Sequence, residues 1–356
     1  MKTETIRILS PINSFEGAIK VIDAGADEIY CGVKYPGVKY HGLSTRTAKC
    51  SIESYHELGK VVKYAHEKGV KVLVTLEFPF MSELLEKTVE KHVKLCAEKD
   101  IDALILGDIG LILKVKQMEL GIPFHASTYL SSMNYEAVDF LRKLGAQRVI
   151  LERQVAIDEI TEIVKNSNGV EIEVFVHGSG CSNINVSCYG CYTPESLIRA
   201  IPNRLSTGDF ESYQNYGFTT PQNKFKMITA PFCRLTYEVQ GNTGQKTYAP
   251  ILDSYSFCSL CKLPMLVKTG VAGFKIVDRC QSKEYQETCT RVYRELTTIL
   301  EQGQIELYNK RMVSIIKDSK ALLFPNFPEV CEQKRCYYSP FFHAPYRMPI
   351  SWKSWE

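Results

Sequence analysis

Residues 173–191, EVFVHGSGCSNINVSCYGC, join a short apolar run to a glycine-bearing loop that carries three cysteines. The run at 174–176 has the β-branched and aromatic content of a buried strand, and it stops at His177 and Gly178. Thiols placed directly after a strand end are placed for ligation, whereas a stabilising thiol would more often sit inside the apolar run. The stretch therefore predicts a buried strand that ends at a functional loop.

The same pattern of an apolar run followed by a helical segment recurs along the chain. The predicted strands are residues 5–12, 28–33, 70–77, 103–108, 123–127, 148–153, 173–178 and 273–278. Continuous apolar runs are typical of parallel strands covered on both faces, and eight β/α units favour a closed (β/α)8, TIM-like barrel. A doubly wound open sheet is the alternative, although no glycine-rich dinucleotide fingerprint follows the first run.

Two segments are predicted to be added to a barrel formed by residues 1–178 and 271–303. Residues 179–270 form a cysteine-rich insertion between strands seven and eight, too long for a simple connection. Residues 304–356 form a C-terminal extension whose later part is rich in proline and aromatic residues, a composition unlike that of disordered chains. We expect this extension to pack on the barrel, to cover its mouth or to meet a second subunit.

The composition is that of an ordinary globular protein, with 45% hydrophobic and 23% charged residues. The net charge of +3 is too small to indicate a nucleic-acid partner by itself. The chain has no apolar run of transmembrane length and no apolar signal-peptide core at its start, so we expect a cytoplasmic protein without membrane insertion. Thiols stay reduced in that compartment, so the clustered cysteines among the 13 of this chain suggest metal or redox chemistry rather than disulfides.

Polar side chains follow nearly every predicted strand. The C-terminal strand ends of a (β/α)8 barrel meet at one mouth, where the chemistry takes place. Buried polar groups need partners, so these residues predict a polar cavity, although a charged residue at a strand end can also simply begin a loop. The candidates for substrate binding or proton transfer are Asp108, His125, Glu152, His177 and Arg279.

Two arginines in this set are candidates for binding a carboxylate. Arg153 and Arg279 each follow a predicted strand, and a guanidinium can hold a carboxylate through two parallel hydrogen bonds. We assign Arg153 to the binding of a cofactor or co-substrate. A surface ion pair is the alternative for each arginine.

The cysteines of the insertion are compatible with two different metal centres. Short C-x2-C pairs are typical of structural zinc, and they occur at Cys188 with Cys191 and at Cys258 with Cys261. A more widely spaced set is compatible with a [4Fe–4S] cluster, and its members are Cys181, Cys188, Cys233 and Cys258. The spacing by itself does not choose between zinc and the cluster.

Long stretches of the chain are similar to one known family, among them EVFVHGSGC at 173–181, GVKVLVTLE at 69–77 and FHASTYLSSMNYEAVDFLRKLGAQRVILER at 124–153. They resemble the U32 family, long called collagenase-like peptidases. The family's two cysteines seven apart after a His-Gly turn match Cys181 and Cys188, its cysteine before an arginine matches Cys233, and its fourth matches Cys258. The resemblance implies a [4Fe–4S] cluster on these four residues. Two neighbouring cysteines that could replace a ligand are Cys191 and Cys261.

The resemblance also implies an activity. Family members act as oxygen-independent hydroxylases of 23S rRNA, of tRNA wobble uridine or of a ubiquinone precursor, with prephenate implicated as the source of the hydroxyl oxygen. We therefore expect an iron–sulfur hydroxylase or oxidoreductase that acts on RNA or a small aromatic substrate, with a second U32 subunit or another copy of the chain as its protein partner.

Two other functions remain as alternatives. The first is a peptidase, as the family name says, although the chain has no G-x-S-x-G motif and Lys60 stands where an H-E-x-x-H motif would need its second histidine. The second is a non-catalytic RNA-binding module with a zinc or iron–sulfur centre, in which the aromatic residues of the C-terminal extension stack on bases.

Overall fold

The computed structural model describes residues 5–35, 50–77, 83–179, 236–240, 246–250, 256–324 and 337–338. The chain divides into two compact units. The first combines Met1–Gly180 with Tyr255–Glu356, and the second is Cys181–Ser254. In the second unit, β9 (Thr236–Gln240) and β10 (Lys246–Pro250) pair as an antiparallel two-stranded sheet.

The first unit is built on eight parallel strands that form a closed barrel. The ring is closed because β1 pairs with β12 on one side and with β2 on the other. The strands are β1 (Arg7–Pro11), β2 (Glu28–Val33), β4 (Lys71–Leu76), β5 (Ala103–Leu106), β6 (Phe124–Ala126), β7 (Arg148–Ile150), β8 (Glu171–Ser179) and β12 (Gly273–Ile276). The predicted TIM-like barrel is therefore confirmed, and the doubly wound open sheet is wrong.

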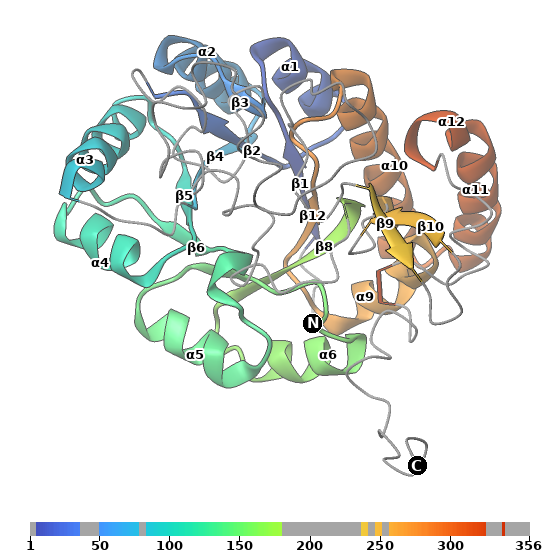
Figure 1. Ribbon diagram of the computed structural model, residues 1–356. Coiled ribbons are helices and arrows are strands. Elements are labelled where there is room, and N and C mark those ends of the chain that lie inside the picture. Colours follow the sequence, from blue (N-terminus) through green and yellow to red (C-terminus); the bar gives the residue numbers. More distant parts are fainter. Residues whose placement is uncertain are drawn as a thin grey trace. The chain divides into compact units, whose positions relative to one another are not determined.

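Helices surround the ring of strands, as Figure 1 shows. They are α1 (Phe15–Asp23), α2 (Tyr55–Glu67), α3 (Glu83–Ala97), α4 (Ile109–Gln117), α5 (Tyr135–Lys143), α6 (Ile157–Lys165), α9 (Leu263–Thr269) and α10 (Lys283–Glu301). Several begin at a side chain that accepts a backbone N–H of the first turn, such as Ser14 at α1, Ser54 at α2 and Ser282 at α10. Among the described residues, none of the helices combines the length and the apolar content that a membrane span requires.

Four further elements belong to the barrel unit. β3 (Ser51–Ile52) pairs in parallel with the end of β2. β11 (Ser256–Cys258) pairs antiparallel with β8, and Cys258 stands opposite His177. α11 (Ile305–Asp318) and α12 (Lys320–Leu323) lie outside α10 (Figure 1). Residues 256–269, which the sequence analysis grouped with the insertion, thus add a strand and a helix to the barrel unit.

Two residues of the C-terminal extension pack on the barrel. Tyr337 and Tyr338 are buried. The Tyr337 backbone N–H donates to the carbonyl oxygen of Cys258 at 3.1 Å, and the Tyr338 hydroxyl donates to that of Phe175 at 2.6 Å. This part of the extension therefore contacts β8 and β11.

A disulfide joins Cys50 to Cys280 across 230 residues of sequence. The sequence analysis assigned metal or redox chemistry to the clustered cysteines, and it did not predict the pairing of these two separate ones. Closure of the barrel is the physical reason. It brings β12 beside β1 and β1 beside β2, and each cysteine lies at the end of a segment fixed to one of these strands.

Candidate active site in the barrel lumen

The lower lumen cluster, at the N-terminal ends of the strands, is a network of charges of which Glu28, Arg148 and Glu173 are buried. Its members are Arg7, Glu28, Arg148, Glu171 and Glu173. The Arg148 guanidinium, 2% exposed, donates from Nη2 to Glu28 Oε1 at 2.8 Å, from Nη1 to Glu173 Oε2 at 2.8 Å and from Nε to Glu171 Oε2 at 2.9 Å. Arg7 pairs with Glu171 at 2.5 Å. Every charge in this cluster thus has a close partner of opposite sign.

The middle of the lumen contains one lysine and one histidine whose charged forms are disfavoured. Lys275 Nζ lies 3.4 Å from Glu173 Oε1 and 4.1 Å from the centre of the Tyr30 ring. Burial lowers the pKa of Lys275, and the Glu173 carboxylate opposes that shift. His125, 5% exposed, stands opposite Ile105 and Arg148 in the strand register.

The His125 imidazole is neutral at ordinary pH. Burial lowers its pKa well below the usual value, and the positive charges of Arg148 and Lys275 lower it further. Its Nδ1 atom is buried and has no hydrogen-bond partner among the residues that the structure describes. A neutral imidazole can donate a proton from one nitrogen and accept one at the other, so His125 provides an unused polar atom in the lumen.

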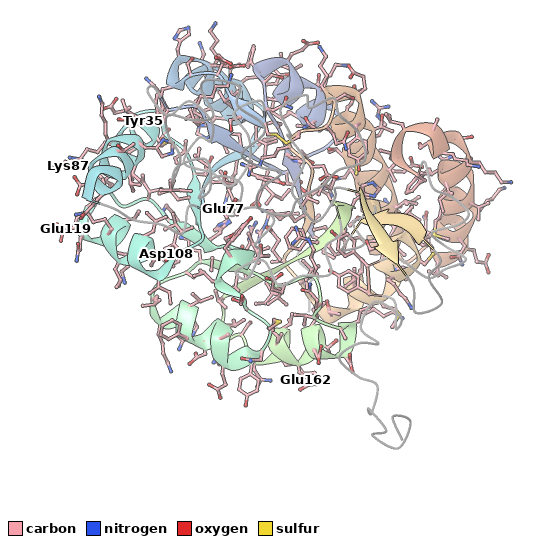
Figure 2. The ribbon with its side chains drawn as sticks, viewed as in Figure 1. Tyr35, Glu77, Lys87, Asp108, Glu119 and Glu162 are labelled. Carbon is pink, nitrogen blue, oxygen red and sulfur yellow. A yellow bond between two sulfur atoms is a disulfide. The ribbon has the colours of Figure 1, made fainter. Side chains whose placement is uncertain are left out.

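The upper lumen cluster, at the C-terminal ends of the strands, consists of Thr75, Glu77, Ser127 and Arg279. The Ser127 hydroxyl donates to Glu77 Oε1 at 2.6 Å, and Arg279 Nη1 donates to Thr75 Oγ1 at 2.5 Å. Arg279 Nη2 lies 3.7 Å from Glu77 Oε2, beyond hydrogen-bond distance. Figure 2 shows Glu77 inside the ring of strands. Because Arg279 follows β12 and Thr75 lies on β4, this guanidinium reaches across the lumen.

Glu152 and Arg153 follow β7, and both are buried. The Arg153 guanidinium carbon lies 4.2 Å from the centre of the Phe175 ring, a cation–π contact. The Glu152 backbone N–H donates to the carbonyl oxygen of Ser132 at 3.2 Å. The stacked guanidinium and the Phe175 ring of β8 thus form a buried pair that combines a planar charge with an aromatic face.

Asp108 is engaged in capping α4. Its Oδ1 atom accepts the backbone N–H of Leu111 at 2.8 Å, which satisfies a donor of the first helical turn. Figure 2 shows Asp108 beside α4. The structure therefore gives this carboxylate a structural contact outside the two lumen clusters.

His177 lies between β8 and α10, outside the lumen. Its Nδ1 is 3.2 Å from the Tyr293 hydroxyl oxygen, and its ring packs against Tyr285 and Phe324. Burial lowers the pKa of His177 to about 3. His177 points away from the lumen because the register shifts between β8 and β12. Phe175 and His177, two residues apart on β8, stand opposite the consecutive residues Lys275 and Ile276 of β12. This bulge reverses the alternation, so His177 does not share the side of Phe175.

Cys258 is the one proposed metal ligand that falls among the described residues. Cys181, Cys188 and Cys233, together with Cys191, lie outside them. Cys258 is half-buried at the end of β11, and Cys261 is exposed. Within the described ranges no group of three or more His, Cys, Asp or Glu side chains is arranged to hold a metal ion. The ligand set and its zinc alternative therefore stay predictions.

The hydroxyl group of Tyr293 links β8 to the end of β11, where Cys258 lies. Tyr293, on α10, donates to the carbonyl oxygen of Val176 at 2.7 Å and lies 3.4 Å from the backbone nitrogen of Ser259. The same oxygen contacts His177. Tyr293 thus connects β8 to the residue that follows Cys258, and it gives the backbone there a defined position.

Several lumen residues were missed because they lie inside the strands instead of at their ends. Tyr30, Thr75, Glu173 and Lys275 belong to this group. A usable signal was present: Glu171 and Glu173 alternate with apolar residues, and Lys275 interrupts an otherwise apolar run. A charged residue with period-two spacing in a strand indicates that one face meets polar groups.

The fold and the lumen define this protein as a (β/α)8 barrel with a polar interior. The model of peptidase family U32 matches residues 13–195 and 229–324, so the chain belongs to that family. It is 28% identical over 325 residues to an uncharacterized protease of Methanocaldococcus jannaschii, covering 88% of this chain and 71% of the relative.

Other relatives have names that refer to RNA. The chain is 32% identical over 314 residues to tRNA hydroxylation protein P of Escherichia coli, covering 81% of this chain and 67% of that protein. It is 26% identical over 309 residues to a 23S rRNA 5-hydroxycytidine synthase of the same organism, covering 85% of this chain but 41% of that protein.

Proposed function

We propose that this chain is an iron–sulfur oxidoreductase that hydroxylates a base in RNA, with a carboxylate co-substrate of the prephenate type. The observation that carries the proposal is the upper lumen cluster, where the buried Arg279 guanidinium reaches across the mouth to Thr75 and lies near Glu77. The names of the relatives that hydroxylate tRNA or synthesise 5-hydroxycytidine support RNA as the substrate class.

Arg279 has the chemistry needed to bind the carboxylate. Its two terminal nitrogens can donate in parallel to one carboxylate. Thr75 orients one of these nitrogens, and Glu77 lies near the other, itself held by Ser127. A carboxylate that enters the mouth would meet this guanidinium next to Thr75 and Glu77.

Two other parts of the lumen can serve the substrate. The neutral His125 can hold or accept a proton at Nδ1. The Arg153 guanidinium on the Phe175 ring provides a planar charged group on which a base or aromatic ring can stack. The roles proposed for Glu152, Asp108 and His177 rest on sequence position alone, and the contacts of Asp108 and His177 place them outside the lumen clusters.

The cluster ligands proposed are Cys181, Cys188, Cys233 and Cys258. Cys258 suits the role because its thiol is half-buried and its backbone is fixed, since Tyr337 donates to its carbonyl oxygen and Tyr293 contacts the next residue. A bound [4Fe–4S] cluster would supply one-electron redox chemistry. We further propose a cytoplasmic location and a second U32 subunit or another copy of this chain as protein partner.

The peptidase alternative finds no support in the described cysteine–histidine contact. Cys96 Sγ lies 3.6 Å from His92 Nε2, one turn apart on α3. Burial raises the pKa of the Cys96 thiol, and burial lowers the pKa of His92 to about 4, so both groups are neutral. Nucleophilic catalysis needs a thiolate, which this pair does not provide.

The proposal is tested first by metal analysis and then by a product search. Protein purified without oxygen should contain about four irons and four sulfides per chain and absorb broadly near ~400 nm. Incubation with unmodified RNA and prephenate should then give a hydroxylated nucleoside detectable by mass spectrometry. One zinc per chain without colour would exclude the cluster, and a metal-loaded protein that modifies no RNA would exclude the substrate class.

A further inference from the structure

The Cys50–Cys280 disulfide joins two sulfur atoms in unlike surroundings. Cys50 is 1% exposed, whereas Cys280 is exposed on the loop between β12 and α10. A solvent-borne reagent should therefore approach the bond from the Cys280 side, because Cys50 is shielded by the protein. Disulfide exchange depends on which sulfur is accessible, so this asymmetry defines the atom that is attacked.

Cys280 directly follows Arg279, and the backbone between them is tightly held. The carbonyl oxygen of Arg279 accepts hydrogen bonds from Asn13 Nδ2 at 2.7 Å and from Gln286 Nε2 at 3.2 Å. Asp278 has a φ of 82°, a left-handed conformation that costs energy for a residue with a side chain. A strained turn persists only when its surroundings hold it, and the disulfide is one of the links that do so.

Cys50 is anchored to the opposite side of β1. It immediately precedes β3, whose Ser51 stands beside Gly32 of β2, and the Lys34 backbone N–H donates to the carbonyl oxygen of Ile52 at 2.9 Å. The disulfide therefore connects the β2–β3 side of the mouth to the β12 side. Breaking it would release Arg279 from its covalent connection to β3.

We propose that Cys50 and Cys280 form a thiol–disulfide exchange site for low-molecular-weight thiols of the glutathione or cysteine class, and that the disulfide form holds Arg279 in the upper lumen cluster. The inference goes beyond the proposed hydroxylation and does not depend on the metal cluster. It identifies a covalent modification site beside the binding residue of the barrel mouth.

The exchange balances as a two-electron reaction. In oxidation, the Cys280 thiolate attacks one sulfur of a small disulfide RSSR, and one RS⁻ leaves and takes up a proton. Cys50 then loses its proton and attacks Sγ of Cys280, which forms the protein disulfide and expels the second RS⁻. The two cysteines together lose two electrons and two protons, and RSSR becomes two RSH. Reduction runs through the same mixed disulfide on Cys280 in reverse.

The exchange is tested by differential alkylation and peptide mapping of the wild-type chain. The protein is equilibrated with mixtures of glutathione and glutathione disulfide, alkylated in denaturant, reduced and alkylated again with an isotopic reagent. We expect the second label on residues 50 and 280 together, rising as the mixture becomes more oxidising, while the buried Cys96 keeps the first label throughout. Labelling of residues 50 and 280 that does not follow the mixture would overturn the proposal.

The order of attack is tested with single variants. Cys50→Ser should accumulate one glutathione on Cys280, because the resolving thiol is missing, whereas Cys280→Ser should leave Cys50 unmodified in its buried position. Equal modification of the remaining cysteine in the two variants would contradict the assignment of Cys280 as the attacked sulfur. The wild-type labelling above does not depend on whether either variant folds.

The effect on Arg279 is tested with the arginine reagent phenylglyoxal. In the disulfide form Arg279 is buried and should react slowly. In the reduced form it should react at least several-fold faster. Arg148, buried in the lower lumen cluster and remote from the disulfide, should stay protected in both forms, and the exposed Arg291 should react in both. Unchanged protection of Arg279 after reduction would exclude the positional role.

Discussion

The lower and upper lumen clusters are both polar, but their arginines have different partners. In the lower cluster Arg148 reaches three carboxylates at hydrogen-bond distance. In the upper cluster Arg279 Nη1 donates to the Thr75 hydroxyl at 2.5 Å, and its Nη2 lies 3.7 Å from Glu77 Oε2. A guanidinium shared by three carboxylates supports the fold, whereas a guanidinium beside hydroxyl groups at the barrel mouth is placed where an anionic ligand could meet it. We therefore expect substitutions in the lower cluster to affect stability most, and substitutions in the upper cluster to affect ligand binding most.

Breaking the lower cluster should have the largest effect. Arg148→Met removes the shared cation and leaves the buried Glu28 and Glu173 with only the longer 3.4 Å contacts to Arg7 and Lys275, which should lower the free energy of unfolding by about 3–5 kcal/mol. Urea denaturation measures the loss. Arg291→Met, at an exposed i,i+4 pair, is the control and should leave stability unchanged within error. A loss below about 1 kcal/mol for Arg148→Met would mean that the lower cluster is not structural.

Breaking the upper cluster should weaken ligand binding more than folding. Arg279→Gln keeps a polar side chain but removes the charge, so prephenate binding should weaken by about tenfold to a hundredfold. Isothermal titration calorimetry measures the affinity, and urea denaturation should show a smaller loss than for Arg148→Met. Retention of wild-type affinity by Arg279→Gln would separate the upper cluster from carboxylate binding.

Lowering the pH should reveal how His125, which lies between the two clusters, contributes to the free energy of unfolding. The pKa of His125 is depressed in the folded state, so below the unfolded value of about 6.5 the unfolded chain binds a proton that the folded chain does not. Stability should therefore fall as the pH drops, and His125 alone should contribute up to about 1.4 kcal/mol per pH unit.

His125→Gln provides the test of this contribution. The variant should lose less stability than the wild type between pH 7 and pH 5, while the difference between the two proteins should stay constant above pH 8. Denaturant unfolding at each pH measures both curves. Parallel curves below pH 6 would show that His125 is not the group whose protonation opposes folding.

The smallest expected effect concerns the hydroxyl that joins β8 to the end of β11. Tyr293→Phe removes hydrogen bonds to the Val176 carbonyl and the Ser259 backbone, and it should cost about 1–2 kcal/mol of stability. If Cys258 binds the cluster, this variant should also release iron to a chelator faster than wild type. Tyr285→Phe, whose ring also contacts His177, is the matched control. Equal iron release from both variants would argue against a positioning role for Tyr293.

Much of the barrel follows from local pattern. The predicted strand at 28–33 matches β2 residue for residue, and the helices that follow Ser14, Ser54 and Ser282 begin at capping side chains that the sequence displays. The eight β/α units could be predicted from apolar runs at near-regular spacing, because the burial of a strand and the amphipathic pattern of a helix are visible in adjacent residues. α11 was not predicted, although it begins shortly after α10, packs on it and has apolar residues at helical spacing.

The candidate site was predicted less completely. His125, Glu152, Arg153 and Arg279 were identified from strand ends and are buried near the lumen, whereas Asp108 caps a helix and His177 faces α10. The direction of a side chain at a strand end depends on whether the alternation continues, and a single bulge between β8 and β12 decided it for His177. The catalytic and binding roles of all these candidate residues stay predictions.

The amino-acid sequence by itself determined the (β/α)8 architecture, the family and the cysteine-rich stretch after the seventh strand, because these depend on periodicity and on motifs of adjacent residues. Only the tertiary structure decided which polar residues meet. Glu28 and Arg148 are 120 residues apart, Thr75 and Arg279 are 204 apart, and Cys50 and Cys280 are 230 apart. Closure of the barrel brings these pairs together, and contacts of such separation leave no periodic signal in the chain.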